Sequence, residues 1–448
     1  MTRRPVAAVG AALALAVASY AVHDLADRGH TAAVRSNADP TGAALALDPP
    51  NASTETTRLI SSYEAIAHGH QDEGVDVMLG SLYLQRGKLT GDLGTYQQAL
   101  AAATAAVHLA PRDPKTHTLL ASALFSLHDW TGARAAARRA LSIDPHDDGA
   151  AVVAADCDVE TGHYADAGAV YRLLNRKVSG SASLTVRQAR LAWATGDLPT
   201  ARRLADLALR LAPDNGATGP GLAFYDVFAG QLAIDAGGYA DARRYARAAV
   251  TTAPAWHVAL AALGRADAAS GDLDGAIAAY RRAVQIVPQP DYLAALGDLL
   301  TLTGDARGAQ QQYATVGAII RIASAQRGVY NRQLVLYAAD HSVGVAIAVR
   351  MARAELDTRR DASGYDALAW ALHAAGQDAQ ARGYSDHALS ISAVDPRFEW
   401  HAAAIAAALG DKSRARRLLT DVLHRTPVFD PLQSRHAAAL LASLRGAG

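Results

Sequence analysis

The chain has 448 residues; half are apolar but only 6% are aromatic, so alanine and leucine must supply most of its core. Residues of this kind suit closely packed helices better than a sheet. Lysine plus arginine and aspartate plus glutamate number 43 each, and with no net positive charge we expect no nucleic-acid partner. The single cysteine, Cys157, can form neither an intramolecular disulfide nor a thiolate metal cluster.

The N-terminus has the pattern of an export signal. Arg3 and Arg4 precede an uncharged, largely apolar stretch, residues 5–22. Small residues before Ser19 form a cleavage site, but 18 residues can also span a bilayer as an uncleaved anchor, and both outcomes stay open. We therefore expect residues 1–22 to be a signal peptide or signal anchor. The rest of the chain would then be extracellular or in the cell envelope, free or attached to the outer face of the plasma membrane through residues 5–22.

Residues 23–71 are rich in Asp, Pro, Ser, Thr and Asn and show no sustained periodicity, which predicts a flexible linker. Tyr63, Ile66 and Ala67 have the spacing of one helix face. They predict a short amphipathic helix near the end of this linker that packs on the following domain.

From about Asp72 onward two signals recur with a fixed period. Prolines follow apolar helical stretches, and 34 residues separate Pro111 from Pro145 and Pro254 from Pro288. Between the prolines a glycine precedes an alanine by five residues, with the glycines at Gly162, Gly196, Gly237, Gly271, Gly304, Gly376 and Gly410. Glycine supplies a left-handed helix C-cap, alanine permits close helix crossing, and proline stops the helix.

A 34-residue period with small residues at fixed places resembles the tetratricopeptide repeat. This resemblance implies an all-α fold, an α-α superhelical solenoid of about ten helix pairs over residues 72–448, besides the N-terminal signal or anchor helix. A last helix around Ser434–Leu444 would be the polar cap that such arrays need. Three departures are expected: an extra loop at Lys88–Thr95, an insertion at Asp214–Pro220, and an irregular segment at Ile319–Arg360.

The sequence gives little sign of a catalytic, nucleotide-binding or metal-binding motif. No P-loop, H-E-x-x-H, C-x-x-C or G-x-S-x-G motif occurs. His68, His70 and the acidic residues after them lie on a polar stretch where solvated side chains are expected. We therefore expect no catalytic residue, cofactor or metal. The alternative is an enzyme or ligand-binding protein with a site near His341 and His373 in the irregular late repeats, although no nucleophile, base and orienting group share a recognisable spacing.

In tetratricopeptide proteins the first helix of each repeat lines a groove that holds a partner, and the resemblance implies the same here. The register places six residues of the late repeats on this face: Asn331, Asp366, Trp370, His373, Arg397 and Trp400. Two interpretations stay open: they brace the helices, or they form an aromatic and charged partner-binding surface. The expected partner is a protein or peptide of unknown identity. Residues 329–334 and 364–372 also resemble segments of exported bacterial, actinobacterial-like tetratricopeptide proteins.

Overall fold

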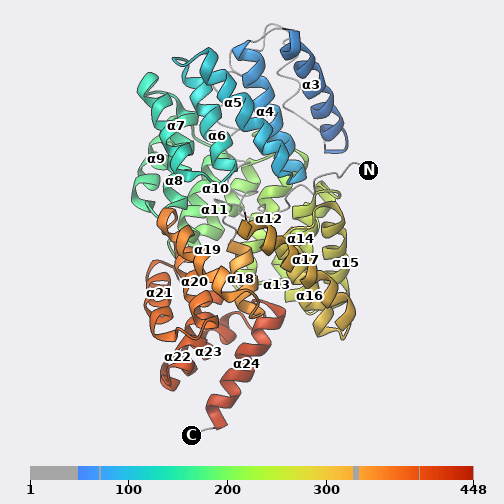
Figure 1. Cartoon of the computed structure of the whole chain (residues 1–448), viewed down its shortest axis with the longest axis vertical. Helices are drawn as coiled ribbons and strands as arrows, with labels where there is room; N and C mark the ends of the chain where they lie inside the picture. Colours follow the sequence, from blue (N-terminus) through green and yellow to red (C-terminus); the bar gives the residue numbers. More distant parts are fainter. Residues whose placement is uncertain (1–48, 70–71, 326–331, 393, 447–448) are drawn as a thin grey trace. The chain divides into compact units, whose positions relative to one another are not determined.

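The computed structural model describes residues 49–69, 72–325, 332–392 and 394–446, and these form the helices α3 to α24 (Figure 1). No strand occurs within these ranges, so the predicted all-α fold class is confirmed. The predicted signal or anchor segment, residues 1–22, lies outside the described residues. None of the described helices is both long and apolar enough to cross a membrane.

The helices follow one another as antiparallel pairs, and their number matches the ten pairs expected. The pairs are α4 (Glu73–Thr90) and α5 (Leu93–Leu109), α6 (Pro114–Ser126) and α7 (Trp130–Ile143), α8 (Asp148–Glu160) and α9 (Tyr164–Lys177), α10 (Ala182–Ala194) and α11 (Leu198–Leu211), α12 (Gly219–Asp235) and α13 (Tyr239–Thr252), α14 (His257–Ala269) and α15 (Leu273–Ile286), α16 (Pro290–Leu302) and α17 (Ala306–Ala325), α18 (Arg332–Asp340) and α19 (Val345–Thr358), α20 (Ala362–Ala374) and α21 (Asp378–Ile391), α22 (Pro396–Ala408) and α23 (Lys412–Arg425). A single helix precedes them, α3 (Pro49–Gly69), and a single helix follows, α24 (Pro431–Gly446).

The helix expected near the end of the linker is α3, which has 21 residues and packs against α4. Its contact runs through Ile60, which is buried, whereas Ile66 is half exposed. The Tyr83 hydroxyl of α4 donates a hydrogen bond of 2.5 Å to the Glu64 carboxylate of α3. Tyr63 and Ala67 pack against the same cluster as Ile60, as the spacing predicted, whereas Ile66 faces solvent.

The recurring glycines and alanines have the roles that the sequence predicted. All seven glycines of the signal have positive φ, from 71° at Gly376 to 90° at Gly196. The alanines five residues later are buried, and Ala201 and Ala276 have no exposed surface. A left-handed glycine ends the first helix of each of these pairs, and the alanine allows the second helix to approach closely.

The extra loop predicted at Lys88–Thr95 is wrong. Helix α4 continues to Thr90, and Gly91, with φ of 67°, ends it. Asp92 then caps α5 by accepting hydrogen bonds from the backbone N–H groups of Gly94 and Thr95. The additional residues lengthen the two helices instead of forming a loop. The glycine that stops α4 comes about one turn later in the helix than the corresponding glycines of the other pairs.

The other two departures are visible in the structure. The insertion corresponds to an irregular connection between α11 and α12, which begins at Gly219. In the late repeats α17 is described up to Ala325 and α18 from Arg332 to Asp340, on either side of residues outside the description. Gly344, in the left-handed region with φ of 63°, precedes α19 and replaces the usual glycine-alanine signal.

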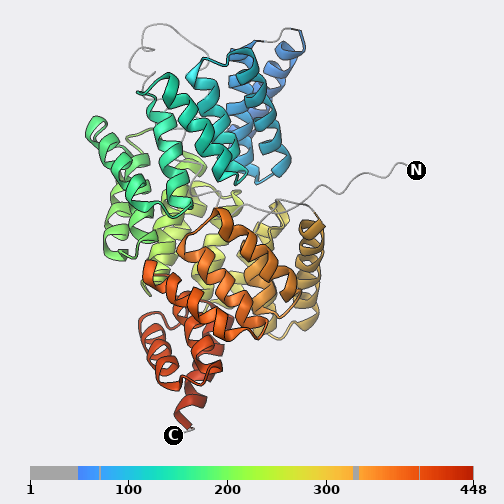
Figure 2. The ribbon, with the colours of Figure 1, turned by 60° about the vertical axis from the view of Figure 1, so that its left-hand side comes forward.

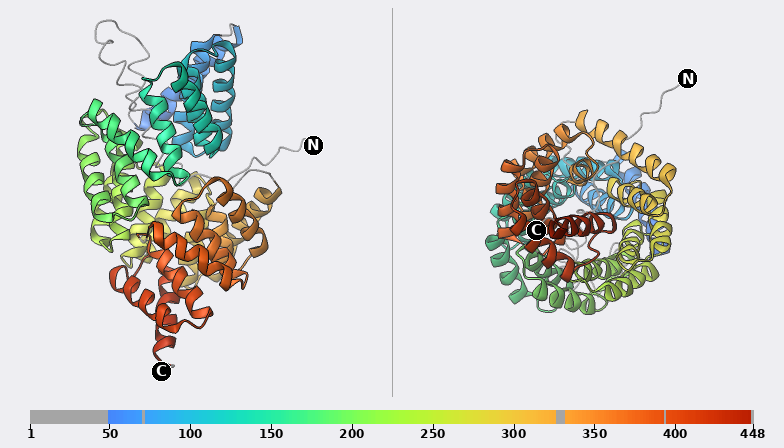
Figure 3. Two further views of the ribbon diagram at one scale, coloured as in Figure 1. Left: turned by 90° about the vertical axis from the view of Figure 1, so that its left-hand side faces the viewer. Right: turned by 90° about the horizontal axis from the view of Figure 1, so that it is seen from below.

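The chain divides into two compact units. The first contains the described residues up to Leu191 together with residues 203–228 and 251–256, and its pairs α4 to α9 stack in chain order (Figure 2). The second contains residues 192–202 and 229–250 and the described residues from His257 onward. Within the second unit α24 contacts α16, α22 and α23, and seen from below in Figure 3 (right) this dark red helix lies near the centre of the view.

Candidate functional site

Two of the predicted partner-binding residues, Trp370 of α20 and Trp400 of α22, lie together in the second unit. Their ring centroids are 6.0 Å apart, and the exposed fractions are 7% and 5%. They share an apolar cluster with Leu419 and Val422 of α23 and with Leu441 of α24. Helices α20 and α22 are the first helices of successive pairs, and we call these first helices the inner helices. They bring the two tryptophans together as the register predicted, but the rings are buried by packing.

The polar atoms around Trp370 are hydrogen-bonded within the unit. Its indole N–H donates to Asp340 at 2.7 Å. The ring stacks on His401 at 4.1 Å between centroids and on His373 at 4.9 Å. Asp366 lies 2.9 Å from Nδ1 of His401. The predicted residues Asp366, Trp370 and His373 thus form one network, whose further member His401 the sequence analysis missed although it directly follows Trp400.

The remaining predicted residues lie at the edge of this network or outside the description. Arg397 holds the Asp395 carboxylate with two of its nitrogens, and its side chain is 48% exposed. The indole N–H of Trp400 donates to Oε1 of Gln433 in α24 at 3.0 Å. Asn331 lies outside the described residues. The structure therefore joins five of the six predicted residues in one unit, and their role in partner binding stays a prediction.

Carboxyl groups are crowded on the inner helices next to this network. Burial, with the charges of Asp430 and Asp340 adding to it, raises the pKa of Asp298 to about 8, against the hydrogen bond from Tyr313. Burial likewise raises the pKa of Asp340 to about 6 and that of Asp235 to about 7. These carboxyl groups therefore hold protons at a higher pH than solvated aspartates do.

The alternative site near His341 and His373 has the geometry of a brace. Nε2 of His341 lies 3.3 Å from Asp298, and its ring packs against Tyr313 and Tyr337 at 4.7 and 4.5 Å. Burial and the charge of His436 lower the pKa of His341 to about 4, so it is a weak base. Among the described residues no serine, threonine or cysteine is hydrogen-bonded to His341, and His373 pairs with Asp378 instead.

Metal and thiol chemistry gain no support from the geometry. In the described part of the chain no three His, Cys, Asp or Glu side chains are grouped so that they could hold a metal ion. Cys157 is buried, and burial together with the charges of Asp156 and Asp158 raises the pKa of its thiol. The thiolate needed for nucleophilic chemistry is thus disfavoured.

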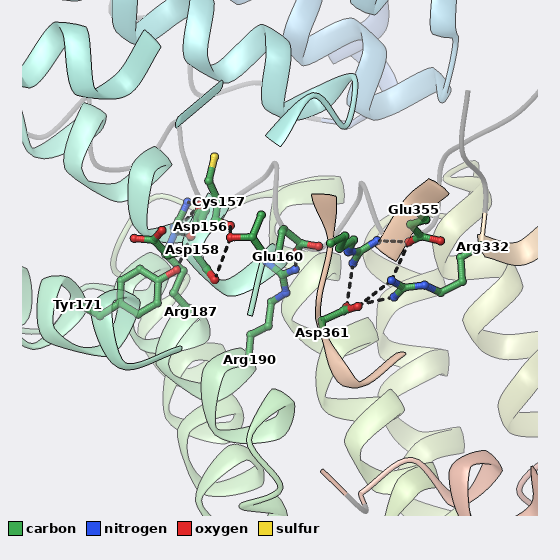
Figure 4. A network of polar contacts seen from close by, with 12 residues as sticks. Asp156, Cys157, Asp158, Glu160, Tyr171, Arg187, Arg190, Arg332, Glu355 and Asp361 are labelled. Carbon is green, nitrogen blue, oxygen red and sulfur yellow. Dashed lines mark hydrogen bonds and ion pairs between the residues drawn. The ribbon is translucent and has the colours of Figure 1, made fainter. Parts of the chain in front are cut away.

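In the first unit a buried ion pair joins two successive inner helices (Figure 4). Nε of Arg187 in α10 donates to both carboxylate oxygens of Asp156 in α8, at 2.9 and 3.0 Å. Tyr171 of α9 donates to the same carboxylate at 2.6 Å, and Arg187 also donates to Ser183. A fully hydrogen-bonded buried pair of this kind fixes how neighbouring repeats align.

A second buried charge network lies in the irregular repeats of the second unit (Figure 4). Arg332, at the start of α18, donates to Glu355 at 2.7 Å and to Asp361 at 2.8 Å. Asp361 also caps α20 by accepting from the N–H of Gly364. Although burial raises the pKa of Asp361, the charges of Arg332 and Arg359 lower it below its usual value. This network joins α18, α19 and the start of α20.

Comparison with known proteins identifies the repeats. Two family models described as tetratricopeptide repeat match the chain, one over residues 84–148 and 229–291 and the other over residues 124–184. The chain therefore contains tetratricopeptide repeats.

Solved structures similar to this chain include the crystal structure of the APC/C hetero-tetramer Cut9–Hcn1, 13% identical, with 88% of this chain and 92% of that chain covered and a TM-score of 0.33. Another is yeast Tom70, 12% identical, with 91% and 97% covered and a TM-score of 0.37. No curated protein matches the sequence.

Proposed function

We propose that this chain is a non-catalytic scaffold that binds a protein or a peptide through the inner helices of its second unit. Arrays of helical repeats present extended inner surfaces suited to such partners. The observation that carries the proposal is the convergence of Asp366, Trp370, His373, Arg397 and Trp400, from two successive inner helices, on one network. Aromatic rings edged by an arginine are the composition of interface hot spots.

The partner meets the exposed edge of this network first. Arg397 is the most accessible of its members, and half of its side chain is exposed. The charge of Asp395 above all, with those of Asp366 and Asp235 adding to it, raises the pKa of Arg397 against the effect of burial. An arginine held by Asp395 in this way is a pre-oriented donor for a carboxylate or a carbonyl of the partner.

The test is capture of a partner from an envelope extract, followed by a charge reversal on the inner face. We expect Arg397→Glu to abolish capture, whereas Arg416→Glu on the exposed surface of α23 leaves it unchanged. The two variants make the same change of charge, and both must melt like the parent. Equal capture by both variants would show that the partner binds elsewhere.

We also propose that the chain belongs to an exported group of bacterial tetratricopeptide proteins and acts outside the cytoplasm. The support is the sequence pattern of residues 1–22. Fractionation of cells that express the full chain is the test, and recovery of the full-length protein in the cytoplasm would contradict the proposal. The brace-like geometry of His341 gives no reason to prefer an enzyme.

A further inference from the structure

Segments about 190 residues apart in the sequence touch one another within the second unit. The backbone N–H of Val428 donates to the Tyr239 hydroxyl at 2.8 Å, across 189 residues. The Ser392 hydroxyl donates to the backbone carbonyl of Trp193 at 3.4 Å, across 199 residues. The turns of the fourth and fifth helix pairs therefore meet the segments that follow the ninth and tenth pairs.

Gly237 shows how close this approach is. A Cβ atom at Gly237 would lie 2.3 Å from the carbonyl oxygen of Arg425, which is backbone and has no room to retreat. Gly304 caps a helix with a similar positive φ, 88° against 73° at Gly237, yet a Cβ there would meet nothing within 4 Å. The close packing is thus particular to Gly237. We call the contacts of Trp193, Gly237 and Tyr239 with Ser392, Arg425 and Val428 the latch.

Helix α24 also joins early and late helices of the second unit. Seen from below in Figure 3 (right), this dark red helix lies near the centre of the view. Helix α24 contacts α16 on one side and α22 on the other. Its Ala437 and Leu441 are buried, and its Gln433 accepts the hydrogen bond from Trp400. The part of the inner face that contains Trp400 is therefore covered by the chain itself, while Arg397 at its edge stays half exposed.

We propose that the second unit is held closed by the latch and α24, and that opening of the latch is the step that admits a partner to the inner helices. This inference rests on the proposed function. The two hydrogen bonds of the latch described above each join a neutral donor to a neutral acceptor, and the charges of Asp395 and Arg397 act on Asp235 between the same two segments. Loss of one such bond raises the population of an open state by about two- to tenfold, a change that a partner's binding energy can easily supply.

The first test measures whether the latch opens. In Tyr239→Phe the N–H of Val428 loses its acceptor, and in Gly237→Ala the added methyl group collides with Arg425. We expect faster hydrogen exchange at Val428 and along α24 in both variants. Gly304→Ala is the matched control, because it strains a helix cap equally without touching the latch. Equal exchange at Val428 in all three variants would show that the latch does not exist in solution.

The second test measures access and needs no partner. A cysteine at Ala404, which is buried in the cluster that contains Trp400 and Leu441, is labelled with a small maleimide and with a maleimide on a polyethylene glycol chain, while buried Cys157 provides the background. We expect Gly237→Ala and Tyr239→Phe to speed labelling by the bulky reagent about two- to tenfold, with the small reagent much less affected. A cysteine at the exposed Arg416 should label equally in every background.

Two outcomes separate this inference from the proposed function. If Val428 exchanges faster in the latch variants but bulky labelling at position 404 is no faster than in the chain with an intact latch, the latch does not govern access and the inference is wrong. If labelling responds as expected while Arg397→Glu still captures the partner normally, the latch is a gate but the partner site has been misplaced.

Discussion

Gly264 offers a measurement of how tightly the helices of one pair are packed. It lies in the middle of α14, and a Cβ atom there would be 2.6 Å from Cδ2 and 2.8 Å from Cε2 of the Tyr280 ring in α15. Tyr280 is 5% exposed, so its ring has little space into which it can move. Overpacking of this kind costs about 1 to 3 kcal/mol. Replacing a mid-helix glycine by alanine gains about 1 kcal/mol from helix propensity, which leaves Gly264→Ala destabilised by about 0 to 2 kcal/mol.

A second glycine isolates the packing contribution. Gly383 also lies inside a helix, α21, but a Cβ atom there would meet nothing within 4 Å. Gly383→Ala should therefore gain about 0.5 to 1 kcal/mol of stability. The propensity gain is common to both variants, so the difference between them, about 1 to 3 kcal/mol, measures the overpacking alone. Urea unfolding followed by circular dichroism, with local hydrogen exchange of α14 and α15, gives both numbers. Equal stability of the two variants would refute the close Gly264–Tyr280 contact.

Three further predictions concern the array, its charges and its N-terminus. Ala276→Leu should destabilise the array by about 1 to 3 kcal/mol, because Ala276 has no exposed surface at its helix crossing, and unchanged urea unfolding would contradict that packing. The pKa of Asp298 is raised from 3.8 to about 8, so its contribution to the second unit's stability is complete below about pH 4 and is lost as the pH rises through 8. Asp298→Asn should flatten that decline in urea midpoints, whereas Asp274→Asn on the exposed surface of α15 should not. Mass spectrometry of the mature protein should find Ser19 at the N-terminus if the signal is cleaved, and an intact N-terminus would favour the anchor.

The sequence predicted the local features of the fold because each depends on neighbouring residues only. A left-handed glycine such as Gly162 and a buried alanine such as Ala167 are required by one helix pair, and the pair repeats. Their spacing therefore revealed the period and the number of pairs. The prediction of a loop at Lys88–Thr95 was wrong for the same reason. Residues that only place the glycine further along the chain lengthen the helix, and the repeat pattern is kept.

The candidate site was predicted less completely, because its contacts join different repeats. The register placed Trp370 and Trp400 on adjacent inner helices, but it carries no information on how deeply the rings are buried. His401 and Gln433 were missed since their importance comes from contacts with Asp366 and Trp400 in other pairs. The latch depends on how the helix pairs coil over almost 200 residues, and no local pattern encodes that.

The burial of the two tryptophans and their proposed role in binding are compatible if the partner replaces α24. Trp370 keeps its hydrogen bond to Asp340 and its stacking on His401 when α24 leaves, because neither of these residues belongs to α24. Trp400 loses the Gln433 acceptor and the cover of Leu441 at the same time. A partner must therefore supply an acceptor and an apolar contact to Trp400 above all. The larger share of the binding energy should then fall on Trp400, while Trp370 serves mainly to hold the inner helices in place.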